Sequence, residues 1–242
     1  MNTIETARHR VAIAGFVSDA ITGKAVAGVD VAVTDMPPQF KKKVGLNAIQ
    51  FGAKWAGMIE RPDRTRSRID GLFYFLDLPD GDYGLRIAAP SFGSRYGTVG
   101  RKVTVARDAN GTFKLDWAIV GLPPTTVKGA VTGKEGAGED VVRFAQVRVK
   151  GSGESAFSDH AGQYLIAGIE PGRRTLMVSA QGYRPISQTV LIAAPGAVQT
   201  MNFGLHSETG PAADQVGVRE ADLAHATDAT TRAGKEKQHG RR

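Results

Sequence analysis

An internal repeat constrains the fold of this chain more than any other feature of its sequence. A block that begins with a glycine, carries an aromatic residue two positions later and ends with a second glycine ten positions after the first occurs twice. Its defining residues are Gly71, Phe73 and Gly81 in the first copy and Gly162, Tyr164 and Gly172 in the second. Glycine supplies the positive φ that tight turns often require, and the prolines at positions 79 and 171 fix φ at the closing turn. The repeat therefore predicts two units of the same fold.

The segments around each block have the period of β-strands. Residues 29–33 and 145–149 alternate between positions expected to face a core and positions expected to face solvent. Successive side chains of a strand point to opposite faces, so this alternation is typical of a half-buried strand. Further strands are expected at residues 11–17, 83–88, 126–131 and 175–180. Short strands in a chain with 30 glycines and 11 prolines predict Greek-key β-sandwiches.

The order of these elements resembles the carboxypeptidase regulatory-like (transthyretin- or prealbumin-like) domain family. The second copy follows the family pattern directly, with Asp159-His160-Ala161-Gly162-Gln163-Tyr164. The first copy departs from it, because Asp70 directly precedes Gly71 and an insertion interrupts the unit. The resemblance implies a prealbumin-like sandwich, which is also classed with carbohydrate-binding-like folds. It implies no particular activity, since such domains are accessories in many contexts.

The predicted fold class is all-β, with two tandem Greek-key sandwiches. We expect an N-terminal extension (1–10), a first sandwich (11–120) with an insertion (36–66), a linker (121–125), a second sandwich (126–205) and a disordered tail (206–242). No apolar run approaches the ~20 residues that span a bilayer, and residues 1–11 do not resemble a signal peptide. We therefore expect a cytoplasmic protein without a transmembrane segment, unless a non-classical route exports it.

Motifs for catalysis or cofactor binding are not found in the sequence. There are no cysteines, and none of the five histidines has a glutamate three residues later, as a carboxypeptidase zinc site requires. We therefore predict a non-enzymatic protein with no cofactor or metal. Two further sites are weighed and not favoured. Turn aspartates such as Asp70 and Asp159 could bind calcium, but they are expected to cap turns. Lys128 and Asn202 could form an isopeptide bond, but no acidic residue is expected in the core between them.

The insertion is the strongest candidate for a binding site. It contains seven basic and two acidic residues, which supply +5 of the formal net charge of +7. Large apolar side chains flanked by lysines suit an acidic, partly apolar groove of another protein. The candidate partner-binding residues are Phe40, Lys41, Lys42, Lys43, Phe51, Lys54, Trp55 and Met58. Two alternatives stay open: a long loop that packs its aromatics on the first sandwich, and a helix at a membrane surface, which the glycines disfavour.

We therefore predict a structural or interaction module that binds a protein partner or a multiprotein assembly through the insertion and the sandwich loops. An accessory part of a phage-tail-like contractile injection apparatus is one such role. The alternative is a carbohydrate-binding module, for which the available aromatics are Trp55, Tyr96, Trp117 and Tyr183. Trp117 lies in an alternating segment and is expected to face the core. Specific nucleic-acid binding is not expected, because the aromatics are not interleaved with basic residues.

Overall fold

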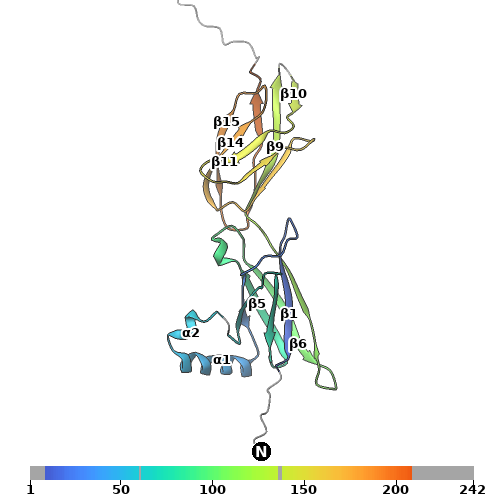
Figure 1. Ribbon diagram of the computed structural model, residues 1–242, viewed down its shortest axis with the longest axis vertical. Coiled ribbons are helices and arrows are strands. Elements are labelled where there is room, and N and C mark those ends of the chain that lie inside the picture. The colour runs from blue at the N-terminus through green and yellow to red at the C-terminus, as the bar shows by residue number, and fades with distance from the viewer. Residues whose placement is uncertain (1–8, 60, 136–137, 209–242) are drawn as a thin grey trace, which may run out of the picture. The chain divides into compact units, whose positions relative to one another are not determined.

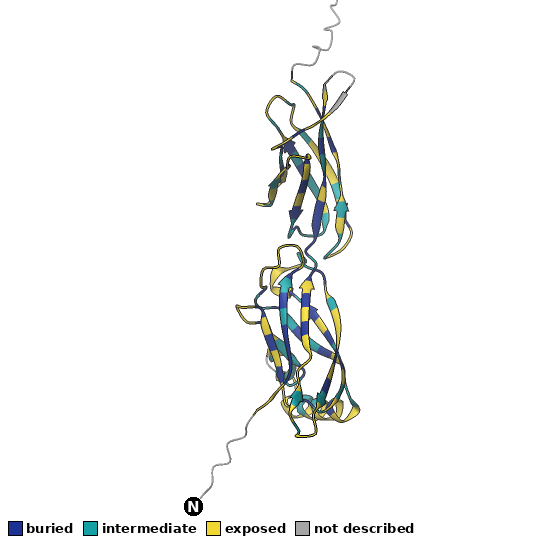
Figure 2. Ribbon diagram, turned by 90° about the vertical axis from the view of Figure 1, so that its right-hand side faces the viewer, coloured by how far each residue is buried: buried dark blue, intermediate teal, exposed yellow. Residues whose placement is uncertain are grey.

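The computed structural model describes residues 9–59, 61–135 and 138–208, without the side chains of 135–139. Within these ranges the chain forms two β-sandwiches, each around its own hydrophobic core, one built from residues 12–122 and the other from residues 127–205. In both, buried and exposed residues alternate along the strands (Figure 2). The expected all-β class is confirmed. Apart from residues 206–208, the predicted tail lies outside the described residues.

The first sandwich contains two sheets, one with the strand order β4-β1-β8 and the other with the order β3-β2-β5-β6-β7. Its strands are β1 (Val11–Asp19), β2 (Asp30–Asp35), β3 (Arg64–Arg66), β4 (Leu72–Leu76), β5 (Gly81–Ala88), β6 (Val99–Arg107), β7 (Phe113–Lys114) and β8 (Trp117–Leu122). A short 3-10 helix, η1 (Pro90–Phe92), precedes β6. Strand β1 pairs antiparallel with β4 and parallel with β8.

The second sandwich repeats this arrangement. Its strands are β9 (Thr126–Glu135), β10 (Gly138–Val141), β11 (Gln146–Val149), β12 (Ser155–Phe157), β13 (Gln163–Ala167), β14 (Gly172–Ser179), β15 (Ile186–Ile192), β16 (Val198–Thr200) and β17 (Phe203–His206). One sheet has the order β10-β9-β13, with β16 and β17 also paired to β9, and the other has the order β12-β11-β14-β15. Strand β9 is antiparallel to β13 and parallel to β16 and β17. In the same way, β1 of the first sandwich is antiparallel to β4 and parallel to β8.

The insertion is largely helical and shorter than expected. It forms α1 (Pro38–Phe51) and α2 (Lys54–Gly57), which lie together on one side of the first sandwich (Figure 1). Pro38 begins α1 at a position where proline is well tolerated, and Gly52, with φ +53°, ends it. Residues 64–66 belong to the sandwich itself, because β3 pairs with β2 as β12 pairs with β11 in the second unit.

Two boundaries differ from the prediction by one or two residues. Strand β8 runs to Leu122, whose side chain is fully buried in the first core, so the first sandwich extends beyond residue 120. Strand β17 ends at His206, one residue beyond the predicted end of the second sandwich. In the described part of the chain, no helix is long and apolar enough to cross a membrane.

Candidate functional site

The helical insertion is fixed to the first sandwich at the start of α1. Phe40 is 1% exposed, and its ring meets the ring of Tyr83 edge-on at a centroid distance of 5.9 Å. Met36 and Val44 also pack against this core. The prediction that Phe40 contacts a partner is therefore wrong: an aromatic side chain next to a run of lysines looked like a surface anchor, but it fills the core.

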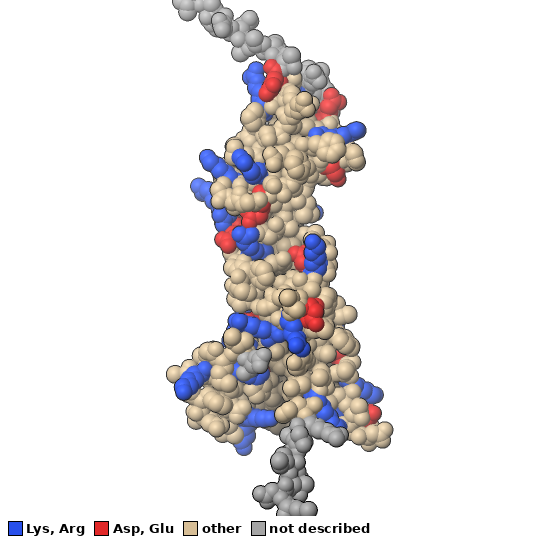
Figure 3. Space-filling view, viewed as in Figure 1, with Lys and Arg blue, Asp and Glu red and all other residues tan. Residues whose placement is uncertain are grey.

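Beyond this anchor, α1 presents both charged and apolar side chains to solvent. Lys41, Lys42 and Lys43 are exposed. Leu46 is 58% exposed and Ile49 is 80% exposed, and their spacing of three residues places them on one helix face. Lys and Arg side chains lie at the margins of the insertion with uncharged surface between them (Figure 3). Leu46 and Ile49 were not among the predicted site residues, although their shared face was visible in the sequence.

A stacked cluster holds the end of the insertion in place. The rings of Phe51 and Trp55 are stacked with centroids 5.9 Å apart, and the Arg61 guanidinium lies 4.7 Å from the centroid of the Trp55 ring. Arg61 also donates to the Trp55 carbonyl at 3.1 Å and pairs with Asp63 at 3.0 Å. Trp55 and Met58 are half-buried, whereas Lys54 is exposed. The structure thus brings Phe51 and Trp55 together, and it gives Trp55 a structural contact within the insertion.

The outer face of the β4-β1-β8 sheet is a second apolar surface, which we call the apolar sheet face. Two rows of paired residues form it: Tyr74, Ala14 and Trp117 in one row, and Leu72, Phe16 and Ile119 in the next. Trp117 is 50% exposed and Ile119 is 68% exposed. In the second sandwich the equivalent row is Leu165, Lys128 and Thr200. The two copies therefore differ at this face, which is apolar only in the first.

Trp117 was expected in the core, and that expectation is wrong. The alternation in β8 has the predicted period but the opposite phase, because Ala118, Val120 and Leu122 are the buried residues. A shift of one residue moves every side chain of a strand to the other face. The sequence prediction placed the large residues at 115, 117 and 119 in the core because they are more apolar in bulk than the smaller residues between them. The repeat defines the position of β1 in the fold, and Trp117 on β8 lies on the same sheet face as Ala14 on β1. This pairing is the signal that could have corrected the phase.

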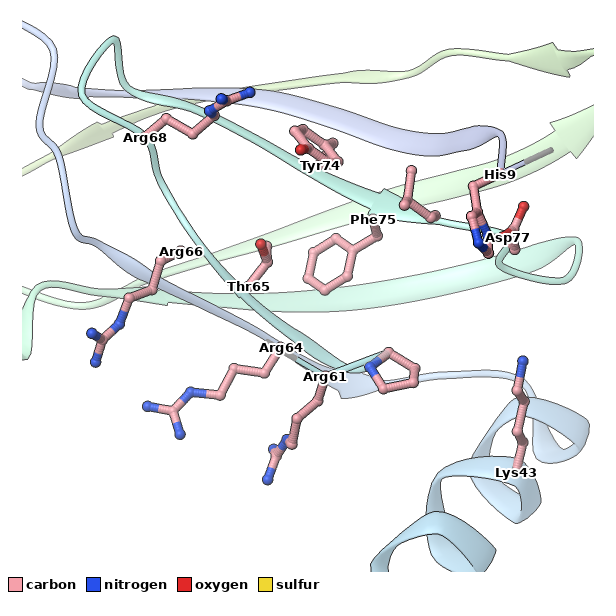
Figure 4. A pocket seen from close by; sticks show the side chains of 12 residues that line it. His9, Lys43, Arg61, Arg64, Thr65, Arg66, Arg68, Tyr74, Phe75 and Asp77 are labelled. Atoms are coloured by element: carbon pink, nitrogen blue, oxygen red, sulfur yellow. Dashed lines mark hydrogen bonds and ion pairs between the residues drawn. The ribbon is translucent and has the colours of Figure 1, made fainter. Parts of the chain in front are cut away.

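A basic groove lies between β3 and β4, the edge strands of the two sheets. It is a cavity of about 590 Å³, and its cationic lining residues are Lys43, Arg61, Arg64, Arg66 and Arg68. In Figure 4, Thr65 and Phe75 lie between the two strands, Arg68 and Tyr74 lie on the β4 side, and Lys43 projects from α1. The side chains of Arg61, Arg64 and Arg66 extend on the β3 side (Figure 4).

Ion pairs neutralise part of the charge of the basic groove. Arg64 and Arg66 share Asp30, at 2.5 Å and 2.7 Å. Burial by itself would raise the pKa of Asp30, but the hydrogen bonds and charges of Arg66 and Arg64 outweigh it and hold that pKa below its usual value. The pKa of Asp77 is also lowered, first by the backbone N–H of Arg10 and then by His9, whose Nδ1 lies 2.5 Å from Asp77 Oδ2.

The other aromatics considered for sugar binding are engaged within the protein. The Tyr96 hydroxyl donates to Asp19 at 3.0 Å, and Tyr183 packs against the second core. This leaves Trp117 as the exposed member of the set in the described chain. Its row neighbours are Ala14, which has no polar side-chain group, and Tyr74, which has a single hydroxyl. Sugar sites combine aromatic platforms with placed polar groups. The carbohydrate hypothesis therefore loses support.

The turn aspartates and Asn202 have structural roles. Asp159 Oδ1 accepts from the N–H groups of Ala161 and Gln163, both at 2.8 Å, and Asp70 Oδ1 accepts from Leu72 N–H at 3.0 Å. Asn202 Oδ1 accepts from Ala130 N–H at 2.9 Å, while Lys128 lies on the exposed face of β9. The aspartates cap turns, as expected, and Asn202 bonds to the backbone of β9.

Comparisons with known proteins support the fold of the second sandwich most directly. The family model of the carboxypeptidase regulatory-like domain matches residues 126–206. No curated protein matches the chain. Among solved structures, the shaft pilin SpaA of Lactobacillus rhamnosus GG is 13% identical, with a TM-score of 0.38, over 84% of this chain and 98% of that one. The minor pilin GBS52 of Streptococcus agalactiae is 10% identical, with a TM-score of 0.31, over 85% of this chain and 98% of that one.

A third structure, the Bacillus anthracis TIE protein, is 11% identical, with a TM-score of 0.35 over 81% of this chain. This chain spans about a third of that protein's length, 34%. All three structural likenesses are too distant to carry more than a general resemblance. The expected family is confirmed for the second sandwich by the family match, while for the first sandwich it stays a prediction from the sequence repeat. Residues 126–206 thus match the carboxypeptidase regulatory-like domain family.

Proposed function

We propose that this protein is a non-enzymatic interaction module that binds a protein partner through the helical insertion of its first sandwich. The observation that carries the proposal is the exposure of Leu46 and Ile49 on a helix whose fixed end, Phe40, is buried in the core. Full burial of such a side chain contributes about 1.5–3 kcal/mol, and the fold itself does not use this contribution here. The exposed Lys41, Lys42 and Lys43 favour an acidic surface around the apolar contact.

The family match supports the non-enzymatic part of this proposal, because domains of this kind are accessories rather than catalytic units. In its most specific form, the proposal places the protein in a cytoplasmic multiprotein assembly, of which a phage-tail-like contractile injection apparatus is one example. An adhesive or structural role in another assembly would use the same surface.

Site-specific photo-crosslinking in native lysate tests the proposal. A benzophenone amino acid at position 49 is compared with the same group at Leu191, which is 66% exposed on the second sandwich. We expect one acidic protein to crosslink at position 49 and not at position 191. A Leu46→Asp/Ile49→Asp variant with unchanged circular dichroism should lose that partner. Identical crosslinked proteins at both positions, or a partner that the double variant retains, would contradict the proposal.

A further inference from the structure

We propose that the free edge of β4 is a docking site for an extended acidic segment of a partner protein, which adds to the β4-β1-β8 sheet as a fourth strand. This inference goes beyond the proposed function, because it uses a different surface from the exposed face of α1. Three properties of the first sandwich carry it: an unpaired strand edge, the apolar sheet face beside that edge, and the positive charge of the basic groove.

Strand β4 is paired along one edge in the described part of the chain, with β1. In an antiparallel pair, every second residue directs its N–H and C=O groups away from the neighbouring strand. The hydrogen bonds show which residues these are. Gly71 C=O accepts from Val17 N–H on β1, whereas Leu72 C=O accepts from Arg68 N–H on the opposite side. Tyr74 and Leu76 share the direction of Leu72, so their backbone groups face the basic groove and can bind an added strand.

The side chains of the same residues offer an apolar contact to that strand. Leu72, Tyr74 and Leu76 are 36%, 42% and 39% exposed on the apolar sheet face. An added strand would place every second side chain beside them, because side chains on neighbouring strands pack in rows. Apolar residues are therefore expected at alternate positions of the partner segment, over about five residues, the usual length of a strand.

The charge of the basic groove indicates which residues should occupy the positions between the apolar residues of the partner segment. Five cationic side chains line it, against the three carboxylates of Asp30, Asp63 and Asp77. Within the described residues, Arg68 and Lys43 form no ion pair; Arg68 lies on the β4 side and Lys43 projects from α1 (Figure 4). A segment with acidic residues between its apolar ones would neutralise this excess, whereas a basic segment would be repelled.

The second sandwich provides an internal comparison. Strand β13 is likewise paired along one edge, with β9, and the bond from Asp159 N–H to Gln163 C=O corresponds to the one from Arg68 to Leu72. Leu165 therefore occupies the position of Tyr74. Its row on the sheet contains Lys128 and Thr200 in place of Ala14 and Trp117. The same strand edge is thus present without the apolar face, which makes β13 a matched control.

Peptide binding to the full-length protein tests the inference. The probe is a short capped peptide in which glutamate and valine alternate, and its affinity is measured by isothermal titration calorimetry at low and moderate salt. The reference probes are a peptide of the same composition with its glutamates in one block, a lysine–valine peptide, and inorganic phosphate. We expect the alternating acidic peptide to bind at least tenfold more tightly than each reference.

Variants then locate the binding site. Tyr74→Pro removes an N–H that faces the free edge while leaving the pairing with β1, and proline is tolerated on edge strands. We expect it to weaken binding at least tenfold, while Leu165→Pro in β13 has no effect. Arg68→Glu should weaken binding, whereas Arg173→Glu on the second sandwich should not. If Tyr74→Pro fails to fold, hydrogen exchange of the wild-type protein replaces it, with the peptide expected to protect the amides of Tyr74 and Leu76.

Several outcomes would overturn the inference. Equal binding of the blocked and alternating peptides, or competition by phosphate alone, would show a simple anion site. Binding that survives Tyr74→Pro, or a bound peptide that leaves the Tyr74 amide unprotected, would exclude strand addition, and so would no peptide binding at all. The Leu46→Asp/Ile49→Asp variant should bind the peptide as the wild type does, so failure here is separable from failure of the proposed function.

Discussion

Two glycines at equivalent positions show how single residues set the cores of the sandwiches. Gly15 on β1 pairs with Phe73 on β4, and Gly129 on β9 pairs with Tyr164 on β13. A Cβ at Gly15 would lie 2.3 Å from the Phe73 ring, and one at Gly129 would lie 1.8 Å from the carbonyl oxygen of Met201. In the first sandwich the Phe73 ring needs the space that glycine leaves, and in the second the backbone of Met201, between β16 and β17, needs it.

Substitution of Gly15 by alanine should therefore destabilise the first sandwich. The added methyl group forces the Phe73 ring or the carbonyl of Ala118, 2.6 Å away, to shift, and overpacking of this kind costs about 1–3 kcal/mol. Gly45→Ala in α1 is the control, because no atom lies within 4 Å of its Cβ and alanine favours helix by about 1 kcal/mol. Urea unfolding followed by tryptophan fluorescence measures both. Equal free energies of unfolding for the two variants would show that the Phe73 ring or the Ala118 carbonyl shifts without a cost in stability.

At the level of elements, the sequence predicted the strands better than the faces they present. The repeated glycine and aromatic positions defined β4 and β13 because turn chemistry and a large buried ring are both visible locally. The face of β8 was not predictable in this way, since Trp117 and Ile119 are larger than the buried Ala118 and Val120. The size of Trp117 and Ile119 favoured a phase in which they face the core. The observed phase, in which they face outward, is determined by the pairing of β8 with β1, a strand distant in sequence.

Alanine substitutions along β8 test this phase directly. Leu122→Ala, at a fully buried position, should lower the free energy of unfolding by about 2–5 kcal/mol, because it removes packed methyl groups and leaves a cavity. Ile119→Ala, at a 68% exposed position, should change it by less than about 0.5 kcal/mol. Chemical denaturation measures both. A larger loss for Ile119→Ala than for Leu122→Ala would reverse the assignment of the two faces.

The sequence predicted which segment carries the candidate site, but not which of its side chains are exposed and which are packed in the core. The concentration of lysines and aromatics in the insertion identified the surface to consider, and Lys41, Lys42, Lys43 and Lys54 are exposed there. The sequence could not show that Phe40 enters the core, because the contact with Tyr83 joins elements far apart in the chain. Nor could it place Arg64 and Arg66 beside β4, since the edges of two sheets meet only in the folded sandwich.

For the whole molecule, the central fact is that the described chain has two separate hydrophobic cores. Ile87 is fully buried in the first and Leu176 in the second, and the two sets of core residues share no member. Cooperativity in unfolding follows from shared packing, so each core is expected to unfold as its own unit. The two tryptophans, Trp55 and Trp117, both belong to the first sandwich, so their fluorescence reports on that core.

Thermal unfolding should therefore show two transitions, of which tryptophan fluorescence follows one and far-ultraviolet circular dichroism follows both. Ile87→Ala should lower the midpoint of the fluorescent transition alone, and Leu176→Ala should lower the other alone, because each removes about 2–5 kcal/mol from its own core. If instead both variants displaced the fluorescence and dichroism curves together, the sandwiches would unfold as one cooperative unit. The repeat would then have produced a single folding unit from two copies, and a partner that binds the first sandwich would stabilise the second as well.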